Sequence, residues 1–337
     1  MKQKETNYMI ARVIAQYRGK YKVARKNKEF WAEVAGKMIF AAESTTDYPV
    51  VGDIIKIEEI DGNHAIIQEI LPRKTILQRK ASGKDDIQPI AANIDVAFIV
   101  QAVDRDFNLN RFDRYLVLIK GARIEPIIIL NKIDLISQTE LDEKIAQIKD
   151  RFHNIEILTT SVTNQHGIKE LQNRIKNGKV YCFVGSSGVG KSSIINDLLG
   201  KELIKTREVS ASTKKGKHTT AYRELFILRN GGMVIDNPGI REVGITSASD
   251  AVTDVFNDIA ELARKCKFDN CQHMQEPGCA VLFAVKSGAL SKDKYLNYIK
   301  LKKESAYYSL SSIEKKQKER DFGRLVKNFK KLKNKGK

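Results

Sequence analysis

Short alternating or apolar runs recur along the first 72 residues of the chain. Such alternation predicts half-buried β-strands, and turn residues around Gly19, Gly52 and Gly62 separate the runs. The predicted strands span residues 9–16, 21–24, 30–34, 54–60 and 65–70. Five short strands in about 70 residues are typical of a small barrel such as an oligonucleotide-binding (OB) fold.

Beyond residue 94 the pattern changes to continuous apolar runs that alternate with helical spacing. The apolar runs predict buried strands at residues 95–103, 126–130, 155–158 and 180–184. Apolar residues spaced three and four apart predict helices at residues 109–120, 141–152 and 167–175. Strands that alternate with helices build a doubly wound α/β domain around a parallel sheet.

These patterns predict a multidomain protein made of four segments. They are an OB-like β-barrel at residues 1–72, a polar, turn-rich linker at 73–90, an α/β domain at 91–246 and a mainly helical C-terminal domain at 247–337.

A glycine-rich loop follows the apolar strand at 180–184 and precedes a predicted helix. Residues 185–192 read GSSGVGKS, which matches the GxxxxGKS pattern of P-loop nucleotide hydrolases. Backbone N–H groups and the start of the helix would hold phosphates. Lys191 would act on the β- and γ-phosphates, and the Ser192 hydroxyl would bind Mg²⁺. The expected phosphate-binding residues are Gly185, Ser186, Ser187, Gly188, Val189, Gly190, Lys191, Ser192 and Ser193.

Two upstream segments carry residues that would bind a guanine base. Residues 131–134 read NKID directly after a predicted strand. The Asp134 carboxylate would accept hydrogen bonds from two guanine N–H donors that adenine lacks. Asn131 would stabilise the loop, and the Lys132 stem would cover the ring.

The second base-binding segment is Thr160-Ser161-Val162. It resembles the loop whose backbone contacts the guanine carbonyl, so Ser161 and Val162 are expected binding residues. In ordinary GTPases the base motifs follow the phosphate loop. Here NKID precedes that loop, which predicts a circularly permuted domain.

Downstream residues would contact Mg²⁺ and the γ-phosphate. Residues 236–239 read DNPG, so Asp236 would hold Mg²⁺ through water and the Gly239 N–H would contact the γ-phosphate. The polar, basic segment 210–220 predicts a switch loop, in which Thr219 or Thr220 would sense Mg²⁺ and the γ-phosphate.

The residue after DNPG is Ile240, where Ras-type enzymes place a glutamine that orients the attacking water. Hydrolysis therefore needs another group, or a partner that completes the site. His218 is the nearest polar candidate for catalysis, and the alternative is a surface or structural histidine.

Three cysteines and a histidine lie within 14 residues, at Cys266, Cys271, His273 and Cys279. This set predicts a tetrahedral Zn²⁺ site. Because four protein ligands leave no position for substrate, the zinc would be structural. A helix predicted at 250–265 precedes it, and Cys182 is expected to be a core residue.

The chain carries a formal net charge of +18, which favours a polyanionic partner over a merely solvated surface. The last 54 residues hold 17 basic and five acidic side chains. The first 30 residues hold nine basic and two acidic side chains. Aromatic residues interleave with these basic side chains, and they fit either an RNA-stacking face or the barrel core: Tyr8, Tyr17, Tyr21, Phe30 and Trp31.

No apolar run is long enough for a signal peptide or a membrane span, which predicts a cytoplasmic protein without membrane contact.

Together these motifs resemble the ribosome small-subunit-dependent GTPase family called RsgA (also YjeQ). The resemblance covers nearly the whole chain, in the order NKID, TSV, GSSGVGKSS, GKHTT, DNPGIRE and the cysteine–histidine cluster. It implies an OB barrel, a circularly permuted GTPase domain and a zinc domain. The family's small hydroxyl residue is replaced by Asn237. The family's arginine is replaced by Lys217, which cannot make a bidentate contact.

The resemblance implies GTP hydrolysis coupled to late maturation of the small (30S) ribosomal subunit, with rRNA bound by the barrel and the zinc domain. Turnover is expected to be slow in the lone protein, a monomer, and to be stimulated by the subunit. Ile240 keeps open an rRNA-binding placeholder that binds guanine nucleotide with negligible turnover. A P-loop ATPase or kinase is disfavoured by NKID.

Overall fold

The computed structural model describes most of the chain in two compact units. Unit 1 comprises Met1–Ala81 with Asp86–Val243, and unit 2 comprises Ser82–Asp85 with Gly244–Lys337. The described residues are 8–26, 28–80, 87–104, 107–200, 223–236 and 249–308, with 310, 314, 317, 320 and 324.

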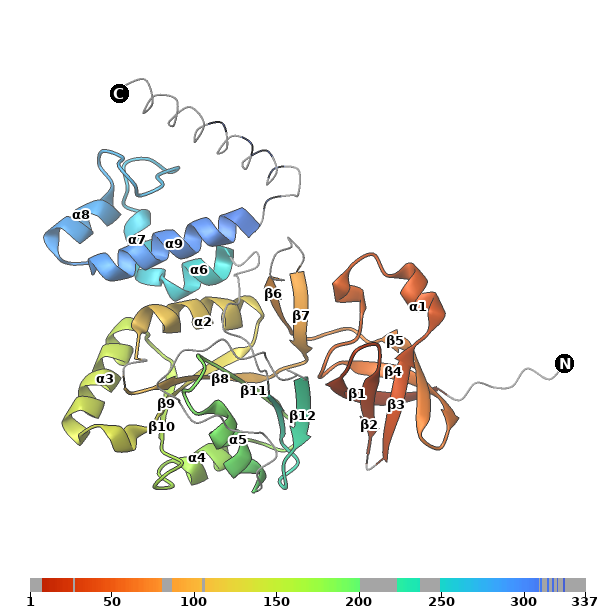
Figure 1. Ribbon diagram of the computed structural model, residues 1–337. Coiled ribbons are helices and arrows are strands. Elements are labelled where there is room, and N and C mark those ends of the chain that lie inside the picture. Colours follow the sequence, from red (N-terminus) through yellow and green to blue (C-terminus); the bar gives the residue numbers. More distant parts are fainter. Residues whose placement is uncertain are drawn as a thin grey trace, which may run out of the picture. The chain divides into compact units, whose positions relative to one another are not determined.

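Unit 1 begins with a closed five-stranded barrel (Figure 1). Its strands pair in the order β1-β2-β3-β5-β4, and β4 pairs back with β1. Alternate residues, among them Val23, Ile57 and Ile67, are fully buried inside it. The predicted barrel is therefore confirmed. The strands are β1 (Tyr8–Gln16), β2 (Tyr21–Arg25), β3 (Lys28–Val34), β4 (Ile54–Asp61) and β5 (His64–Ile70), with α1 (Gly36–Ala41) and a short 3₁₀ helix (Thr45–Asp47) between β3 and β4.

The aromatic residues of the barrel divide between core and surface. Phe30 and Tyr21 are buried, whereas the side chain of Trp31 is 42% exposed. Because successive residues of a strand point to opposite faces, only one of the neighbours Phe30 and Trp31 can enter the core. The Trp31 ring lies 5.3 Å from the ring of Tyr17, centroid to centroid.

Residues 73–90, expected to be a linker, contain most of an antiparallel hairpin. Strand β6 (Ile76–Lys80) pairs with β7 (Ile87–Ala92), and the buried residues Leu77 and Ala91 are cross-strand partners. The hairpin contacts the barrel through a backbone hydrogen bond, in which the Ala92 N–H donates to the Val51 carbonyl at 3.0 Å. Gly52 has φ +93°, and a Cβ there would lie 2.1 Å from the Ala92 oxygen. Only glycine fits this contact.

The α/β part of unit 1 has the predicted parallel sheet. Strand order is β10-β9-β8-β11-β13, all parallel, and β12 joins antiparallel to β13. The fold class predicted for this part is confirmed. The strands are β8 (Val96–Ala102), β9 (Glu125–Asn131), β10 (Glu156–Thr160), β11 (Val180–Val184), β12 (Arg223–Ile227) and β13 (Met233–Asp236).

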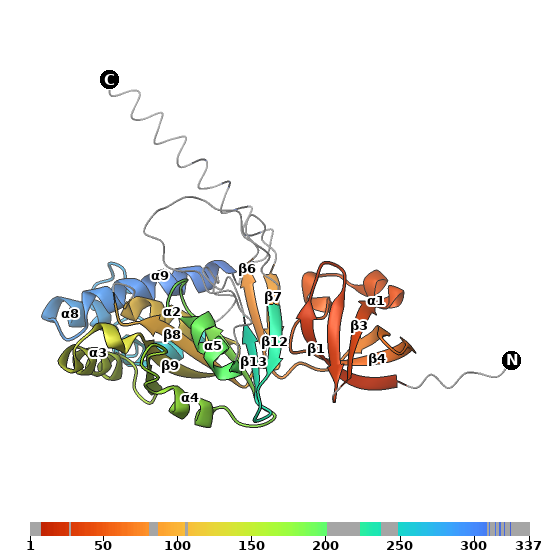
Figure 2. The same ribbon diagram turned by 60° about the horizontal axis from the view of Figure 1, so that its bottom comes forward.

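Helices cover both faces of this sheet, and α2 and α5 lie on opposite sides of the strands (Figure 1 and Figure 2). Leu171 of α4 and Ile194 of α5 join one core cluster with Phe98 and Phe183 of the strands. Cys182 is fully buried in β11, as expected. The helices are α2 (Leu109–Gly121), α3 (Gln138–Arg151), α4 (Ile168–Arg174) and α5 (Lys191–Leu199).

The sheet of the α/β part continues into the barrel. Strand β12 pairs antiparallel with β1, with Ala15 opposite Glu224 and Gln16 opposite Arg223. The Arg223 guanidinium also donates to the Pro89 carbonyl of the hairpin at 3.2 Å. The barrel and the α/β part therefore share one eleven-stranded sheet.

Unit 2 is helical around the cysteine–histidine cluster. The single helix predicted at 250–265 is two helices, because the chain turns at Phe256 (φ −109°, ψ 44°). The Phe256 ring is fully buried, 5.4 Å from the ring of Tyr298. The helices are α6 (Ser249–Val255), α7 (Asn257–Ala263), α8 (Ala280–Ser287) and α9 (Lys292–Tyr308). None of the helices in the described ranges is long and apolar enough to cross a membrane.

Candidate nucleotide site and metal centre

The glycine-rich loop connects the carboxyl end of β11 to the start of α5. Three of its glycines have positive φ, at Gly185 (149°), Gly188 (83°) and Gly190 (99°). Lys191 turns back over the loop, and its Nζ donates to the Gly185 carbonyl at 2.8 Å and to the Ser186 carbonyl at 2.6 Å. This is a strand–loop–helix cradle in which backbone N–H groups and the helix N-terminus suit an anion.

Asn131 joins the NKID segment to this loop. It ends β9, is 2% exposed, and donates from Nδ2 to the Val189 carbonyl at 2.8 Å. The buried Thr160 hydroxyl donates to Asn131 Oδ1 at 3.0 Å. A Cβ at Gly190 would lie 2.2 Å from Asn131 Nδ2, so the glycine allows the two segments to touch. Segments 58 residues apart therefore form one site.

The other expected base-binding residues lie beside Asn131. The Ser161 hydroxyl donates to Asp134 Oδ1 at 2.5 Å, which fixes the carboxylate. Lys132 adopts the left-handed conformation (φ 62°), and its Nζ lies 3.9 Å from an Asp104 oxygen. Val162 packs against the core. The arrangement presents a carboxylate, an aliphatic stem and a backbone loop at one edge of the sheet.

Asp236 ends β13, the strand next to β11. Burial raises the pKa of its carboxyl above the ordinary value, and the positive charge of Lys191 only partly opposes this rise. A bound cation would stabilise the ionised form of this buried carboxyl group. Ser192 lies in the first turn of α5, which follows β11, the neighbour of β13. A hydroxyl and a carboxylate are oxygen ligands of the kind that Mg²⁺ takes.

Arg111 is a residue of this site that the sequence patterns do not indicate. Its Nη1 donates to the Ser186 hydroxyl of the loop at 3.1 Å. The start of α2 is fixed by the buried Gln101, whose amide makes two hydrogen bonds with the Asn108 backbone, at 2.8 and 3.0 Å. Asn108 caps the helix by accepting the Arg111 N–H. A lone arginine in a helical pattern carries no signal for this contact.

Several expected site residues lie outside the described residues. They are His218, Thr219 and Thr220 of the predicted switch loop, Gly239 of DNPG, and Lys217, Asn237 and Ile240.

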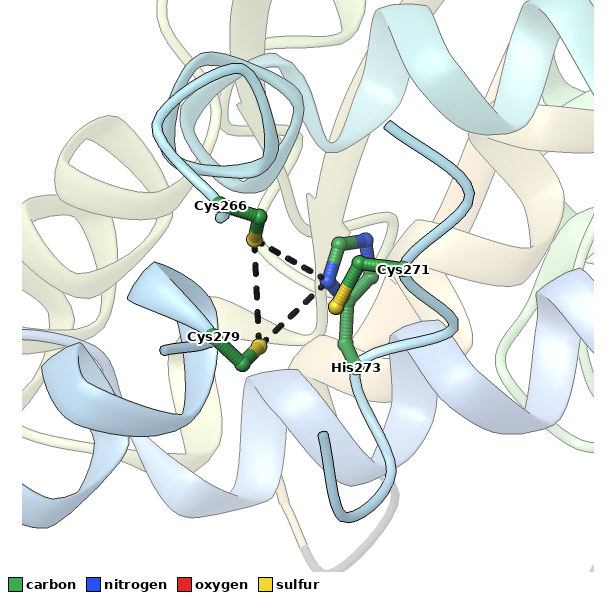
Figure 3. Close-up of side chains that lie close together, drawn as sticks. All are labelled: Cys266, Cys271, His273 and Cys279. Carbon is green, nitrogen blue, oxygen red and sulfur yellow. Dashed lines mark hydrogen bonds between the residues drawn. The ribbon is translucent and has the colours of Figure 1, made fainter. Parts of the chain in front are cut away.

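The cysteine–histidine cluster forms a second site, in unit 2 (Figure 3). His273 Nδ1 lies 3.6 Å from the sulfur of Cys266 and 3.6 Å from that of Cys279, and these sulfurs lie 3.8 Å apart. With Cys271, all four ligand atoms lie within 4.8 Å of one another. Around zinc with Zn–S bonds of about 2.3 Å, tetrahedral sulfur ligands lie about 3.8 Å apart. The donor set and its spacing therefore fit a metal ion.

Glu276 and Tyr295 support the loop that carries these ligands. The Glu276 carboxylate accepts backbone N–H groups of Gln272 and Met274, each at 2.8 Å. These and other backbone hydrogen bonds lower the pKa of Glu276 to about 2. The Tyr295 hydroxyl donates to the His273 carbonyl at 2.7 Å.

A phosphate cradle, a base-binding edge and a carboxylate at adjoining strand ends define a P-loop protein with a guanine-type site. The sequence model of the RsgA GTPase family matches residues 70–246, which is more than half of the chain. The chain belongs to the RsgA GTPase family.

Named relatives agree with this assignment. "Small ribosomal subunit biogenesis GTPase RsgA 1" of Bacteroides thetaiotaomicron is 39% identical over 96% of this chain and 90% of its own length. "Small ribosomal subunit biogenesis GTPase RsgA" of Leptospira interrogans is 41% identical over 96% of this chain and 91% of its own.

Two solved structures share the fold. YjeQ from Thermotoga maritima has a TM-score of 0.65 at 24% identity, covering 89% of this chain and 99% of its own. YloQ, described as a circularly permuted GTPase, has a TM-score of 0.63 at 25% identity, covering 92% and 100%. The predicted permutation is confirmed: β9 with NKID precedes β11 and the phosphate loop in the chain, and pairs with β8 in the same sheet.

Proposed function

We propose that this chain hydrolyses GTP during biogenesis of the small ribosomal subunit. The observation that supports the proposal is the Asn131–Val189 hydrogen bond, which joins the NKID segment to the glycine-rich loop. The cellular process is inferred from relatives that are named for small ribosomal subunit biogenesis and are matched over nine-tenths of their length.

Within the site, Asp134 would bind the guanine edge, with Asn131, Lys132, Ser161 and Val162 around it. The backbone of 185–193 and Lys191 would hold the phosphates of GTP or GDP. Ser192 and Asp236 would hold Mg²⁺, together with Thr219. The magnesium ion would neutralise charge on the phosphates when bound.

The barrel and unit 2 would bind rRNA of the subunit. The net charge of +18 supports this, as do the 17 basic and five acidic residues after residue 283. In unit 2 the four ligands would hold one Zn²⁺ ion, which would stabilise the module. We also propose that the protein is cytoplasmic and monomeric. Light scattering of the purified chain would test the monomeric state.

We expect slow turnover by the lone protein and stimulation by the subunit, because Ile240 cannot orient water as a glutamine does. His218 is the proposed catalytic side chain of the switch loop, besides Lys191 and Thr219. The test compares GTP turnover with and without purified small subunits, using Lys191→Ala as the inactive control. Equal rates in the presence and absence of subunits would disprove this mechanism.

Ile240 also favours a second candidate, an rRNA-binding placeholder that binds guanine nucleotide with negligible turnover. Small-subunit maturation in cells that carry only Lys191→Ala separates the two. Full maturation would favour the placeholder. Arrested maturation, together with stimulated turnover by the unaltered chain, would favour the enzyme.

A further inference from the structure

Trp31 lies on the outer surface of the barrel, between strand neighbours that are buried. Phe30 and Ala32 are 2% and 1% exposed, whereas Trp31 is 42% exposed. Its indole ring packs at 5.3 Å and 50° against the ring of Tyr17. The two rings form an aromatic ledge, Tyr17 and Trp31, that the barrel core does not use.

Three parts of the barrel meet at this ledge. Trp31 lies opposite Lys22 of β2. Tyr17 belongs to the turn between β1 and β2. The backbone N–H of Trp31 donates to the backbone carbonyl of Asn63, in the turn between β4 and β5, at 2.9 Å. In OB folds, the face of the second and third strands and these two turns are the surfaces that bind oligonucleotides.

The charge around the ledge suits a polyanion. Residues 17–33 contain six basic side chains and two acidic ones, Glu29 and Glu33. Both acidic side chains pair with lysines, Glu29 with Lys22 at 2.6 Å and Glu33 with Lys20 at 3.4 Å. A third lysine of the segment, Lys28, pairs with Glu59 at 2.6 Å. The segment still keeps an excess of positive charge beside the exposed Trp31 ring and the half-buried Tyr17 ring. Aromatic platforms within basic grooves bind single strands by base stacking and phosphate contact.

We propose that the Tyr17–Trp31 ledge stacks an unpaired base of single-stranded RNA. The idea rests on the proposed rRNA-binding role and assigns residues to it. Stacking on a π face tolerates any base, so the ledge would select for an unpaired nucleotide and not for a sequence.

The chain contains a single tryptophan, so its indole fluorescence reports on Trp31 alone. The full-length protein is titrated at low salt with a single-stranded oligouridine of about eight nucleotides, a length within OB site sizes. We expect the oligonucleotide to quench the emission in a saturable way. Binding detected by anisotropy of a labelled oligonucleotide, without any change in emission, would overturn the proposal.

Variants locate the contact. Trp31→Leu should weaken oligonucleotide binding by roughly tenfold or more, and Trp31→Phe, which keeps a π face, by roughly threefold or less. The matched control is Phe40→Leu in α1, an aromatic side chain that is 95% exposed on a helix instead of this face. Equal losses for Trp31→Leu and Phe40→Leu would overturn the assignment.

Further measurements complete the test. Thermal unfolding and lone GTP turnover of Trp31→Leu should match the unaltered chain, because the side chain lies outside the barrel core. Quenching by RNA-free ribosomal proteins, and not by the oligonucleotide, would mean that the ledge binds protein, contrary to the proposal. GTP turnover that subunits fail to stimulate would contradict the proposed function and leave the oligonucleotide result standing.

Discussion

At the residue scale, the nucleotide site depends on side chains that bridge segments distant in sequence. Asn131 spans from the base-binding edge to the phosphate loop, and Ser161 holds the Asp134 carboxylate. Because Asp134 is an acceptor only, it suits a base edge that donates two hydrogen bonds. In the proposed site, the chemistry of this one carboxylate would set the base preference.

Asp134→Asn should exchange guanine for xanthine as the preferred base. An amide can donate a hydrogen bond to the additional xanthine carbonyl, and it loses the charge that accepted from guanine. We expect GTP affinity to fall roughly 100-fold, because one hydrogen bond to a charged group is lost where the amide NH₂ faces the guanine amino group. Competition of GTP, XTP and ATP against a fluorescent nucleotide measures this. Unchanged GTP preference would show that Asp134 does not contact the base.

Arg111 and Ser186 should act together on nucleotide binding. Arg111→Ala removes the hydrogen bond that steadies the phosphate loop, and we expect roughly fivefold weaker GTP binding. Ser186→Ala removes the same bond from the other side. A double-mutant cycle with titration of labelled GTP should find the double variant no weaker than the single ones. Additive losses would mean that the two side chains act independently.

At the element scale, the position of a cysteine decides its reactivity, and the chain has one cysteine inside a strand and three in the candidate metal cluster. Cys182 lies inside β11, and burial raises the pKa of its thiol to about 12. Since the thiolate is the reactive form, this cysteine is protected at neutral pH. Cys266, Cys271 and Cys279 belong instead to the candidate metal cluster, between the end of α7 and the start of α8.

Thiol labelling should therefore proceed in steps. The purified chain at pH 7.5 should resist maleimide while zinc is bound. Chelation should release one zinc ion, make three thiols reactive, and lower the melting temperature of unit 2. Cys182 should react only after denaturation, and Cys182→Ala is the control that removes this last step. Labelling of all four thiols on chelation alone would contradict the buried position of Cys182.

At the scale of the whole molecule, one sheet runs from the α/β part into the barrel through β12 and β1. Strand β12 follows the predicted switch loop in the chain and β13 leads into DNPG. Strand β12 is thus hydrogen-bonded both to β1 of the proposed RNA-binding barrel and to β13. Positive charge is concentrated in both terminal segments of the chain.

Binding to the small subunit should depend steeply on salt. Each phosphate neutralised by lysine or arginine releases counterions, so affinity should fall roughly a thousandfold between 50 and 200 mM salt. Residues 309–337 contain eleven basic and three acidic side chains. A chain that ends at residue 308 should bind more weakly and show a shallower slope of log affinity against log salt. Identical slopes would exclude the tail from phosphate contact.

Much of this protein could be read from its sequence, because the decisive patterns are local. Alternating apolar residues indicate the barrel strands, and continuous apolar runs indicate the buried parallel strands. The glycine-rich loop, NKID and the cysteine–histidine spacing each specify a chemistry within a few residues. Their order indicates the permutation. The hairpin at 76–92 was hidden because its polar residues obscure the alternation.

Tertiary structure decided what depends on contacts between distant segments. Phe30 and Trp31 are adjacent and both aromatic, so only the closed barrel determines which ring is buried. Arg111 and Ser186 are 75 residues apart, and no local pattern pairs them. The pairing of β1 with β12 joins Ala15 and Glu224, which lie more than 200 positions apart in the chain. Local patterns fix periodicity and chemistry, whereas long-range packing fixes which faces meet and which side chains remain on the surface.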